Sequence, residues 1–221
     1  MAIPYRAVLF DLDGTLVDSA PDLAGAGNDL RERRGLPALP LDLYRPLTGT
    51  GARGMLRVAL GSSAEQDDFE SIKDEYLSTY AQRMTRLTQV FADMEAVLTG
   101  LEARSTAWGV VTNKHSRFAA PLIDGLGLAG RCAVLVCGDS AARAKPHPDP
   151  LLLAAARLGL APTDCLYVGD DLRDVQAGQA AGMATIAAGW GYLGDGAPIE
   201  AWGADQIAET PRALLKLLDL D

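Results

Sequence analysis

Five short apolar runs punctuate the chain and have the composition of buried β-strands. Each run is continuous rather than alternating, which is typical of a strand covered on both faces of its sheet. Between the later runs, apolar residues recur at the i, i+3, i+4, i+7 spacing of amphipathic helices. Strands that alternate with helices predict an α/β fold built on a doubly wound parallel sheet. The predicted strands are 6–10, 108–111, 133–136, 166–168 and 184–187.

Two stretches carry the clearest helical pattern. Segments 94–101 and 151–158 each place four apolar residues on one face of a helix. The second segment has Pro148 near its start and Gly159 near its end, and these residues favour the beginning and the end of a helix, respectively. Both helices are expected to form crossovers between parallel strands.

The connection after the first strand differs from the others. Residues 18–84 contain no convincing strand pattern, but they carry two amphipathic faces, at 23–30 and 69–84. A glycine-rich stretch, LTGTGARGM at 47–55, lies between these faces. We therefore expect a mostly helical insertion that forms a small cap. The predicted domains are a core of residues 1–17 and 85–221 and a cap of residues 18–84.

The composition fits one folded core with a smaller attachment. Of the 221 residues, 48% are hydrophobic and 6% are aromatic, which argues against disorder. The formal net charge of −9 leaves no basic stripe to neutralise phosphates, so no nucleic-acid partner is expected. No apolar run approaches membrane-spanning length, and the N-terminal stretch turns acidic too early for a signal peptide. A soluble cytoplasmic protein without a membrane partner is therefore expected.

The cysteines support a reducing compartment. They form no CxxC pair and lie within or beside apolar runs, which favours small buried thiols over disulfides. The three are Cys132, Cys137 and Cys165.

Polar side chains gather where four of the predicted strands end. Each cluster alone is explained by a turn, a helix cap or a solvated charge. All four, however, follow the carboxyl ends of strands, and ligands of open α/β sheets bind at that edge. Their coincidence predicts a functional site. The clusters are Asp11 and Asp13; Thr112, Asn113 and Lys114; Lys145; and Asp170, Asp171 and Asp174.

This set of side chains suits phosphate chemistry around a metal ion. Several carboxylates in one crevice repel one another and raise each other's pKa values unless a cation neutralises them. Their oxygens are ligands that Mg²⁺ prefers, and neither Cys nor His is at hand. Lys145 and Thr112 suit the non-bridging oxygens of a phosphate. One aspartate can act as a nucleophile toward phosphorus, and a second can act as general acid and base.

In their order along the chain, the four clusters resemble the four motifs of the haloacid dehalogenase superfamily of phosphatases. DLDGTLVDS at 11–19 is similar to the first motif, and GDDLRD at 169–174 is similar to the fourth. These two motifs together are highly specific, whereas the lone lysine of the third is weak by itself. The resemblance covers nearly the whole chain. It implies a Rossmann-like core with a helical C1-type cap inserted after the first strand.

The resemblance also implies a role for each cluster. Asp11 would be the nucleophile and Asp13 the general acid and base. Mg²⁺ would bind Asp11, the backbone carbonyl of Asp13 and the carboxylate of Asp170. Asp171 and Asp174 would support the metal or its waters. Phosphate binding is implied for Thr112, Asn113, Lys145 and Gly14, of which Thr112 and Lys145 also count as catalytic.

Other protein classes share part of this pattern. Dehalogenases lack the second aspartate of the first motif, and P-type ATPases carry Lys-Thr-Gly-Thr after the nucleophile and are embedded in membranes. A signalling receiver module also gathers aspartates, a hydroxyl and a lysine around magnesium, but it needs neither a cap nor an acid/base. A catalytically idle phosphate-binding relative is a further alternative, although every expected catalytic residue is present. Sugar phosphomutases share the cap and both aspartates of the first motif, so only substrate handling separates them.

The substrate is expected to be a small phosphorylated metabolite that carries a carboxylate. The chain looks most like phosphoglycolate phosphatases, while stretches such as GARGM and GDDLRDVQAGQAAGM look especially like N-acetylmuramic acid 6-phosphate phosphatases. Arg53 is the leading candidate for the carboxylate, because glycines on both sides let its backbone approach a ligand. A monomer or a homodimer is expected. The candidate substrate contacts are Arg53, Thr50, Gly51, Arg45 and His115, whereas Arg117 is expected to be a solvated surface residue.

Overall fold

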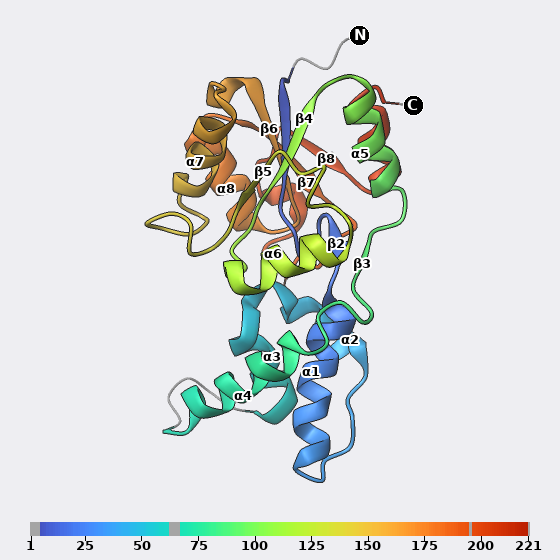
Figure 1. Cartoon of the computed structure of the whole chain (residues 1–221), viewed down its shortest axis with the longest axis vertical. Coiled ribbons are helices and arrows are strands. Elements are labelled where there is room, and N and C mark those ends of the chain that lie inside the picture. The colour runs from blue at the N-terminus through green and yellow to red at the C-terminus, as the bar shows by residue number, and fades with distance from the viewer. Residues whose placement is uncertain (1–4, 62–66, 195, 221) are drawn as a thin grey trace.

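Six parallel strands form one sheet in the computed structural model, which describes residues 5–61, 67–194 and 196–220. The strand order is β5-β4-β1-β6-β7-β8, so the chain moves outward from β1 on one side and then on the other (Figure 1). This reversal makes the carboxyl end of β1 the switch point at which ligands of such sheets bind. The strands are β1 (Ala7–Phe10), β4 (Ala107–Val111), β5 (Val134–Val136), β6 (Cys165–Gly169), β7 (Ala184–Ala188) and β8 (Gln206–Ala208).

The predicted doubly wound sheet is confirmed. All five predicted strands are present, each within one residue of its expected bounds. Of the six strands of this sheet, β8 is the one that the apolar pattern misses. It has three residues, of which Gln206 is exposed and Ala208 is fully buried, so it lacks the continuous apolar run that marks the others.

The central strand β1 is buried on both faces. Val8 and Phe10 belong to one hydrophobic cluster, whereas Ala7 and Leu9 belong to another. All four side chains are inaccessible to solvent. Successive side chains of a strand point to opposite faces, so the continuous apolar run supplies two separate cores.

Helices cover both faces of the sheet. On the face of Phe10 lie α5 (Met94–Ala103), α6 (Ser116–Gly125) and α9 (Pro211–Leu217). On the face of Leu9 lie α7 (Asp149–Leu158) and α8 (Leu172–Ala181). Of these, α5 and α7 confirm the two helices that the sequence predicts most clearly. Among the described residues, no helix is both long and apolar enough to cross a membrane.

The insertion after β1 forms a group of helices at one end of the sheet (Figure 1). Their apolar side chains, among them Tyr44, Met55 and Tyr76, form a separate core, which Phe118 of α6 joins from the sheet domain. The division of the chain at residues 18 and 84 stays a prediction. The helices are α1 (Ala20–Arg33), α2 (Leu41–Tyr44), the 3₁₀ helix η1 (Arg45–Thr50), α3 (Gly51–Leu60) and α4 (Phe69–Ala81).

Two details of the insertion differ from the sequence pattern. The glycine-rich stretch 47–55, which carries neither of the two predicted amphipathic faces, is helical and forms the end of η1 and the first half of α3. The apolar face predicted to run to Met84 outlasts its helix, because α4 ends at Ala81 and the chain continues in tight turns. Met84 still packs against the core of the insertion, which explains why the periodicity extends beyond the helix.

The two connections between sheet and insertion are tied together. The short strands β2 (Val17–Asp18) and β3 (Gln89–Val90) pair antiparallel. In the first turn of α1, the fully buried carboxylate of Asp22 accepts hydrogen bonds from the backbone of Leu87 and from both the backbone and the hydroxyl of Thr88, at 2.8 to 2.9 Å. The segment that leaves the sheet thus holds the segment that returns to it.

Candidate active site

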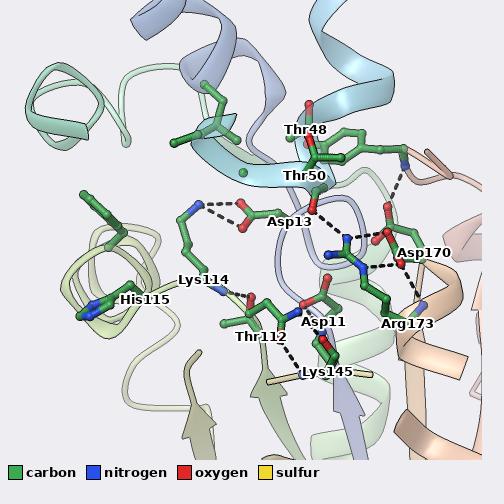
Figure 2. A pocket seen from close by; sticks show the side chains of 18 of the residues that line it. Asp11, Asp13, Thr48, Thr50, Thr112, Lys114, His115, Lys145, Asp170 and Arg173 are labelled. Carbon is green, nitrogen blue, oxygen red and sulfur yellow. Dashed lines mark hydrogen bonds and ion pairs between the residues drawn. The ribbon is translucent and has the colours of Figure 1, made fainter. Parts of the chain in front are cut away.

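Lys145 stands at the carboxyl edge of the sheet (Figure 2). Its ammonium contacts four oxygens. Nζ lies 2.8 Å from Oδ1 of Asp11 and 2.6 Å from Oδ1 of Asp174. It also lies 2.7 Å from the hydroxyl of Tyr167 and 3.1 Å from the carbonyl of Val111. Burial on its own lowers the pKa of Lys145, but the two carboxylates outweigh this effect and hold the pKa above its ordinary value. The lysine is therefore a fixed positive charge beside Asp11.

Asn113 holds the loop that carries Lys145. Its Oδ1 accepts from the backbone nitrogen of Lys145 at 3.0 Å, and its Nδ2 donates to the backbone carbonyl of Lys145 at 3.0 Å. This reciprocal pair resembles the one between two residues of adjacent antiparallel strands. Thr112, the residue before it, accepts a hydrogen bond from the backbone of Lys114 at 3.1 Å. The clusters after β4 and β5 are thereby joined into one unit.

Asp13 is turned toward Lys114 rather than toward Lys145 (Figure 2). Nζ of Lys114 lies 2.9 Å from Oδ1 and 3.0 Å from Oδ2 of Asp13, and the hydroxyl of Ser19 donates to Oδ1. Burial on its own lowers the pKa of Lys114. The negative charge of Asp13 opposes this effect, and the pKa of Lys114 lies above its ordinary value. The ammonium also lies over the ring of Tyr80, 4.8 Å from its centre. Asp13 thus stands between core and insertion.

Asp170 is a buried carboxylate held from both sides. The hydroxyl of Thr15 donates to its Oδ1 at 2.7 Å, and the backbone nitrogen of Tyr192 donates to its Oδ2 at 2.8 Å. Burial, followed by the negative charges of Asp11 and Asp174, raises the pKa of Asp170 well above its ordinary value. A cation at this place would relieve the repulsion.

Gly14 allows the backbone of the first cluster to approach Asp170. Its φ is +91°, in the region that side-chain-bearing residues rarely adopt. A Cβ on Gly14 would lie 2.2 Å from Oδ2 of Asp170 and 2.8 Å from the ring of Tyr192. This position therefore requires glycine, whatever part its backbone has in binding phosphate.

Asp171 and Asp174 form the N-terminus of α8. Asp171 accepts from the backbone nitrogen of Arg173 at 2.9 Å, and Asp174 accepts from the backbone nitrogen of Asp171 at 3.1 Å, which makes a capping box. The guanidinium of Arg173 pairs with Asp171 and donates to the carbonyl of Gly49 in η1 at 2.7 Å (Figure 2). Asp171 is thus engaged with Arg173, which links the sheet domain to the insertion.

Asp11, Asp170 and Asp174 form an acidic group that could hold a metal ion. One carboxylate oxygen of each lies within 4.8 Å of those of the others. All these ligand atoms are oxygens, which suit a hard divalent cation such as Mg²⁺. Asp174, which the sequence analysis expects to support the metal from outside, lies within the group. The residues present therefore fit the expected ion.

A cavity of about 430 Å³ lies between the carboxyl edge of the sheet and the insertion. Thr50 and Gly51 line it from the insertion, and His115 lines it from the end of the loop after β4. The four predicted clusters meet in its wall, as the sequence analysis expects. The members that line it are Asp11, Asp13, Thr112, Asn113, Lys114, Lys145, Asp170, Asp171 and Asp174.

The two candidate arginines of the insertion are not part of the lining. Arg45 forms a bidentate pair with Asp18, with distances of 3.1 and 3.0 Å, and its guanidinium lies 5.7 Å from the ring centre of Tyr192. Arg53 is exposed on α3. The substrate roles of both arginines stay predictions.

The residues after Lys114 point to the rim of the cavity. His115 caps α6 and lies 3.3 Å from a carboxylate oxygen of Asp139, apart from Asp11 and Asp13 (Figure 2). Arg117, expected to be a solvated surface residue, lines the cavity, and its guanidinium lies over a phenylalanine ring at 4.7 Å.

Several residues that shape the site are missed by the sequence analysis. Thr15 and Ser19 stand within the DLDGTLVDS run, so adjacency to a motif is a signal that could have found them. Lys114 belongs to the second predicted cluster, but the sequence pattern assigns it no role of its own. Tyr80 and Tyr192 come from distant segments without such a signal. Their contacts depend on how the insertion and the loop after β7 lie over the sheet.

Comparison with known proteins agrees with this geometry. The family model described as haloacid dehalogenase-like hydrolase matches residues 8–188. A phosphoglycolate phosphatase of Xanthomonas campestris pv. campestris is 47% identical over 210 residues, which cover 95% of this chain and 94% of that protein. An N-acetylmuramic acid 6-phosphate phosphatase of Pseudomonas aeruginosa is 41% identical over 214 residues, covering 97% and 95%. The crystal structure of a predicted phosphoglycolate phosphatase from Haemophilus somnus superposes with a TM-score of 0.84 at 28% identity, covering 97% and 98%.

Proposed function

This chain belongs to the haloacid dehalogenase-like hydrolase family, and we propose that it hydrolyses a small phosphomonoester through a covalent aspartyl-phosphate on Asp11. The chain is a phosphatase, as its family and its similarity to named phosphatases establish. The observation that carries the proposed mechanism is the contact of Lys145 Nζ with Asp11 Oδ1 at 2.8 Å, in the wall of a cavity that Asp13 also lines.

The proposed reaction has two balanced halves. In the first, an oxygen of Asp11 attacks phosphorus, the bond from phosphorus to the leaving alcohol breaks, and Asp13 gives a proton to that oxygen. In the second, Asp13 takes a proton from a water molecule whose oxygen attacks the phosphorus. The bond between Asp11 and phosphorus then breaks and inorganic phosphate leaves. Both aspartates are returned to their starting state.

The remaining residues bind and orient. Lys145 lies beside the attacking carboxylate, so its fixed charge can offset the approach of an anionic phosphate. The Thr112 hydroxyl is available to a non-bridging oxygen, and Asn113 sets the position of Lys145 through the backbone. Each of these groups is in place before substrate arrives, so little reorganisation is needed at the moment of reaction.

A divalent metal, in our proposal Mg²⁺, would be held by Asp11, Asp170 and Asp174, with the backbone carbonyl of Asp13 as the further ligand that the family implies. When bound, such an ion neutralises negative charge on the phosphate and on the nucleophile. The protein's own part is to present the carboxylates. The hydroxyl of Thr15 orients Asp170, and the charge of Lys145 keeps Asp11 and Asp174 together.

The proposed substrate is phosphoglycolate or a similarly small phosphoester with a carboxylate. The relative at 47% identity supports this choice, while the relative at 41% supports N-acetylmuramic acid 6-phosphate as the second candidate. We also propose that the protein works in the cytoplasm as a monomer or homodimer. The absence of a disulfide among its three cysteines supports a reducing compartment.

Phosphate release from a panel of phosphorylated metabolites tests the function. Phosphoglycolate, N-acetylmuramic acid 6-phosphate, a hexose phosphate and p-nitrophenyl phosphate are compared by kcat/KM, with Mg²⁺ and with EDTA. We expect metal-dependent turnover in the wild type and none in Asp11→Asn, whose amide cannot form the covalent intermediate. Ready turnover by Asp11→Asn, with a thermal unfolding curve like that of wild type, would defeat the mechanism.

A further inference from the structure

Four lysine and arginine side chains of the described residues line the cavity, and three of them have other engagements. Lys145 contacts two carboxylates, a hydroxyl and a carbonyl. Arg173 is paired with a carboxylate of its own helix and donates to a carbonyl of η1. Arg117 is exposed and stacks on the neighbouring phenylalanine. The fourth is Lys114, whose surroundings are different.

Lys114 is a buried cation with one donor to spare. Its side chain is 8% exposed, and the hydrogen bonds that its ammonium makes to the described residues both go to Asp13. A lysine ammonium carries three N–H donors, of which Asp13 takes two. Burial of a positive charge costs free energy unless anions pair with it. A further anion that reached the free N–H of Lys114 would therefore be bound favourably.

Tyr80 adds a second polar group without a partner at the same place. Its hydroxyl is buried and makes no hydrogen bond within the described part of the chain, although its residue lines the cavity. The Lys114 ammonium lies 4.8 Å from the centre of its ring. Buried hydroxyls are nearly always hydrogen-bonded, so this one points to a ligand atom that completes the site.

The position of Asp13 shows which part of a substrate would meet these groups. In the proposed mechanism Asp13 protonates the leaving oxygen, so the leaving alcohol must emerge beside Asp13. Lys114 contacts both oxygens of Asp13, at 2.9 and 3.0 Å. An anionic group carried one or two bonds beyond the leaving oxygen would therefore arrive within reach of the ammonium.

We propose that Lys114 and the hydroxyl of Tyr80 form the subsite for an anionic group on the leaving alcohol, a carboxylate foremost. The inference rests on the proposed function and deepens it by assigning the residues that select the substrate. It assigns recognition of the carboxylate to the loop after β4 and to helix α4, not to Arg53 of α3. The same lysine then touches both the acid/base and the group that distinguishes one substrate from another.

Two phosphoesters of matched size test the subsite. Phosphoglycolate carries a carboxylate, and the phosphate ester of glycolamide carries a neutral amide in its place. The quantity measured is the ratio of kcat/KM for the acid to that for the amide. Wild type should favour the acid. Lys114→Met should lower the ratio by about tenfold to a hundredfold, the size of one charge-assisted hydrogen bond, and most of this change should appear in KM for the acid.

Further variants separate recognition from the placement of Asp13. Lys114→Met also removes the partner of Asp13, so a fall of kcat common to both esters is expected and leaves the ratio untouched. Lys114→Arg should restore most of the ratio, and Tyr80→Phe, which deletes a single hydroxyl, should lower it several-fold. Arg53→Ala and Lys216→Met, an exposed lysine of α9, should keep the wild-type ratio.

Each other outcome has a distinct meaning. Equal losses on both esters in Lys114→Met and no change of ratio in Tyr80→Phe would overturn the subsite while the phosphatase function stands. A collapse of the ratio in Arg53→Ala would overturn it in favour of α3. If wild type hydrolysed no ester, p-nitrophenyl phosphate included, the proposed mechanism would fail. The subsite would then be tested without turnover, by calorimetric binding of phosphoglycolate and its amide to wild type and to Lys114→Met. A preference for the acid in wild type that is lost in Lys114→Met would support the subsite.

Discussion

Gly14 and Asp170 approach so closely that no side chain fits between them: a Cβ on Gly14 would lie 2.2 Å from Oδ2 of the carboxylate. The backbone of the turn after β1 therefore packs directly against the carboxylate of Asp170, which follows β6. The two strands are neighbours in the sheet, so the contact joins their ends directly. The glycine of the DLDGT run is therefore a packing requirement of the acidic group.

Gly14→Ala should damage both stability and metal binding. The added methyl must displace Asp170 or Tyr192, and overpacking of this kind typically costs about 1–3 kcal/mol. We expect a lower Tm and a smaller rise of Tm with Mg²⁺. Gly35→Ala is the matched control, because Gly35 also has a positive φ, +70°, but open space around it. If both variants lost the same amount of Tm and Gly14→Ala kept full activity, the loss would come from backbone strain at a positive φ. The close approach of Gly14 to Asp170 would then have no separate effect.

Asp13→Asn should slow turnover without unfolding the protein. The amide oxygen of Asn can still accept from Lys114 and Ser19, although its NH₂ cannot replace the second oxygen that contacts Lys114. The amide cannot pass a proton, so kcat should fall by about 10²–10⁴. The loss should be larger for alkyl phosphates than for p-nitrophenyl phosphate, whose leaving group needs little protonation. Comparison of kcat on the two kinds of ester is the measurement. A loss of the same size on both would assign Asp13 a purely structural part.

Asn113→Ala should weaken phosphate binding through Lys145. The amide supplies both hydrogen bonds that hold the backbone of Lys145, and a misplacement of about 1 Å in such a site can cost roughly 10²-fold in rate. Asn113→Asp keeps the acceptor for the Lys145 backbone nitrogen and loses the donor, so it should fall between wild type and the alanine variant. If inorganic phosphate inhibits all three proteins equally, the loop does not depend on this side chain.

Without metal, the protein should lose stability as the pH rises. Burial and the charge of Asp11 hold the pKa of Asp170 well above its ordinary value, and burial raises the pKa of Asp174 to about 6. The folded state therefore binds these protons more tightly than the unfolded chain, in which an aspartate has a pKa of about 3.9. For these groups the free energy of unfolding should accordingly be highest below about pH 4 and fall as the pH rises above 4. The contribution of Asp174 should be lost as the pH passes about 6, and that of Asp170 as the pH passes its own raised pKa.

Thermal unfolding in EDTA and in Mg²⁺ measures this effect. At neutral pH, Mg²⁺ should raise the Tm of the wild type, since the ion binds the folded state preferentially. Asp170→Asn is the control for all other titrating groups: it should show a flatter dependence of Tm on pH and little gain with Mg²⁺. An equal gain in both proteins would exclude Asp170 as an important ligand.

The convergence of the four clusters is predictable from sequence, because strand ends in a parallel sheet share one edge. Asp11 and Lys145 need no knowledge of loops to be brought together. The contact between Lys114 and Tyr80 is different. Helical periodicity shows that Tyr80 belongs to the buried face of α4, but not which residue of the sheet domain will lie against it.

The structural role of a glycine is hard to predict from sequence, because the same residue serves backbone exposure to a ligand or close packing of helices. Next to Arg53, it suggests backbone exposed to a ligand, yet Gly54 is buried in α3, where an added Cβ would collide with the side chain of Thr50. Its small size serves the packing of α3 against η1. The burial of Met55 and Leu56 decides in favour of a helix over the low helix propensity of the flanking glycines.

The buried carboxylate of Asp22 fastens the two chain connections of the insertion to each other. Leu87 and Thr88 are fastened to α1, so neither connection can stretch or slide without the other. Because both connections meet at this one carboxylate, a displacement of the insertion relative to the sheet is expected to shift Tyr80 and Thr50 together, so the two would keep their spacing across the cavity wall.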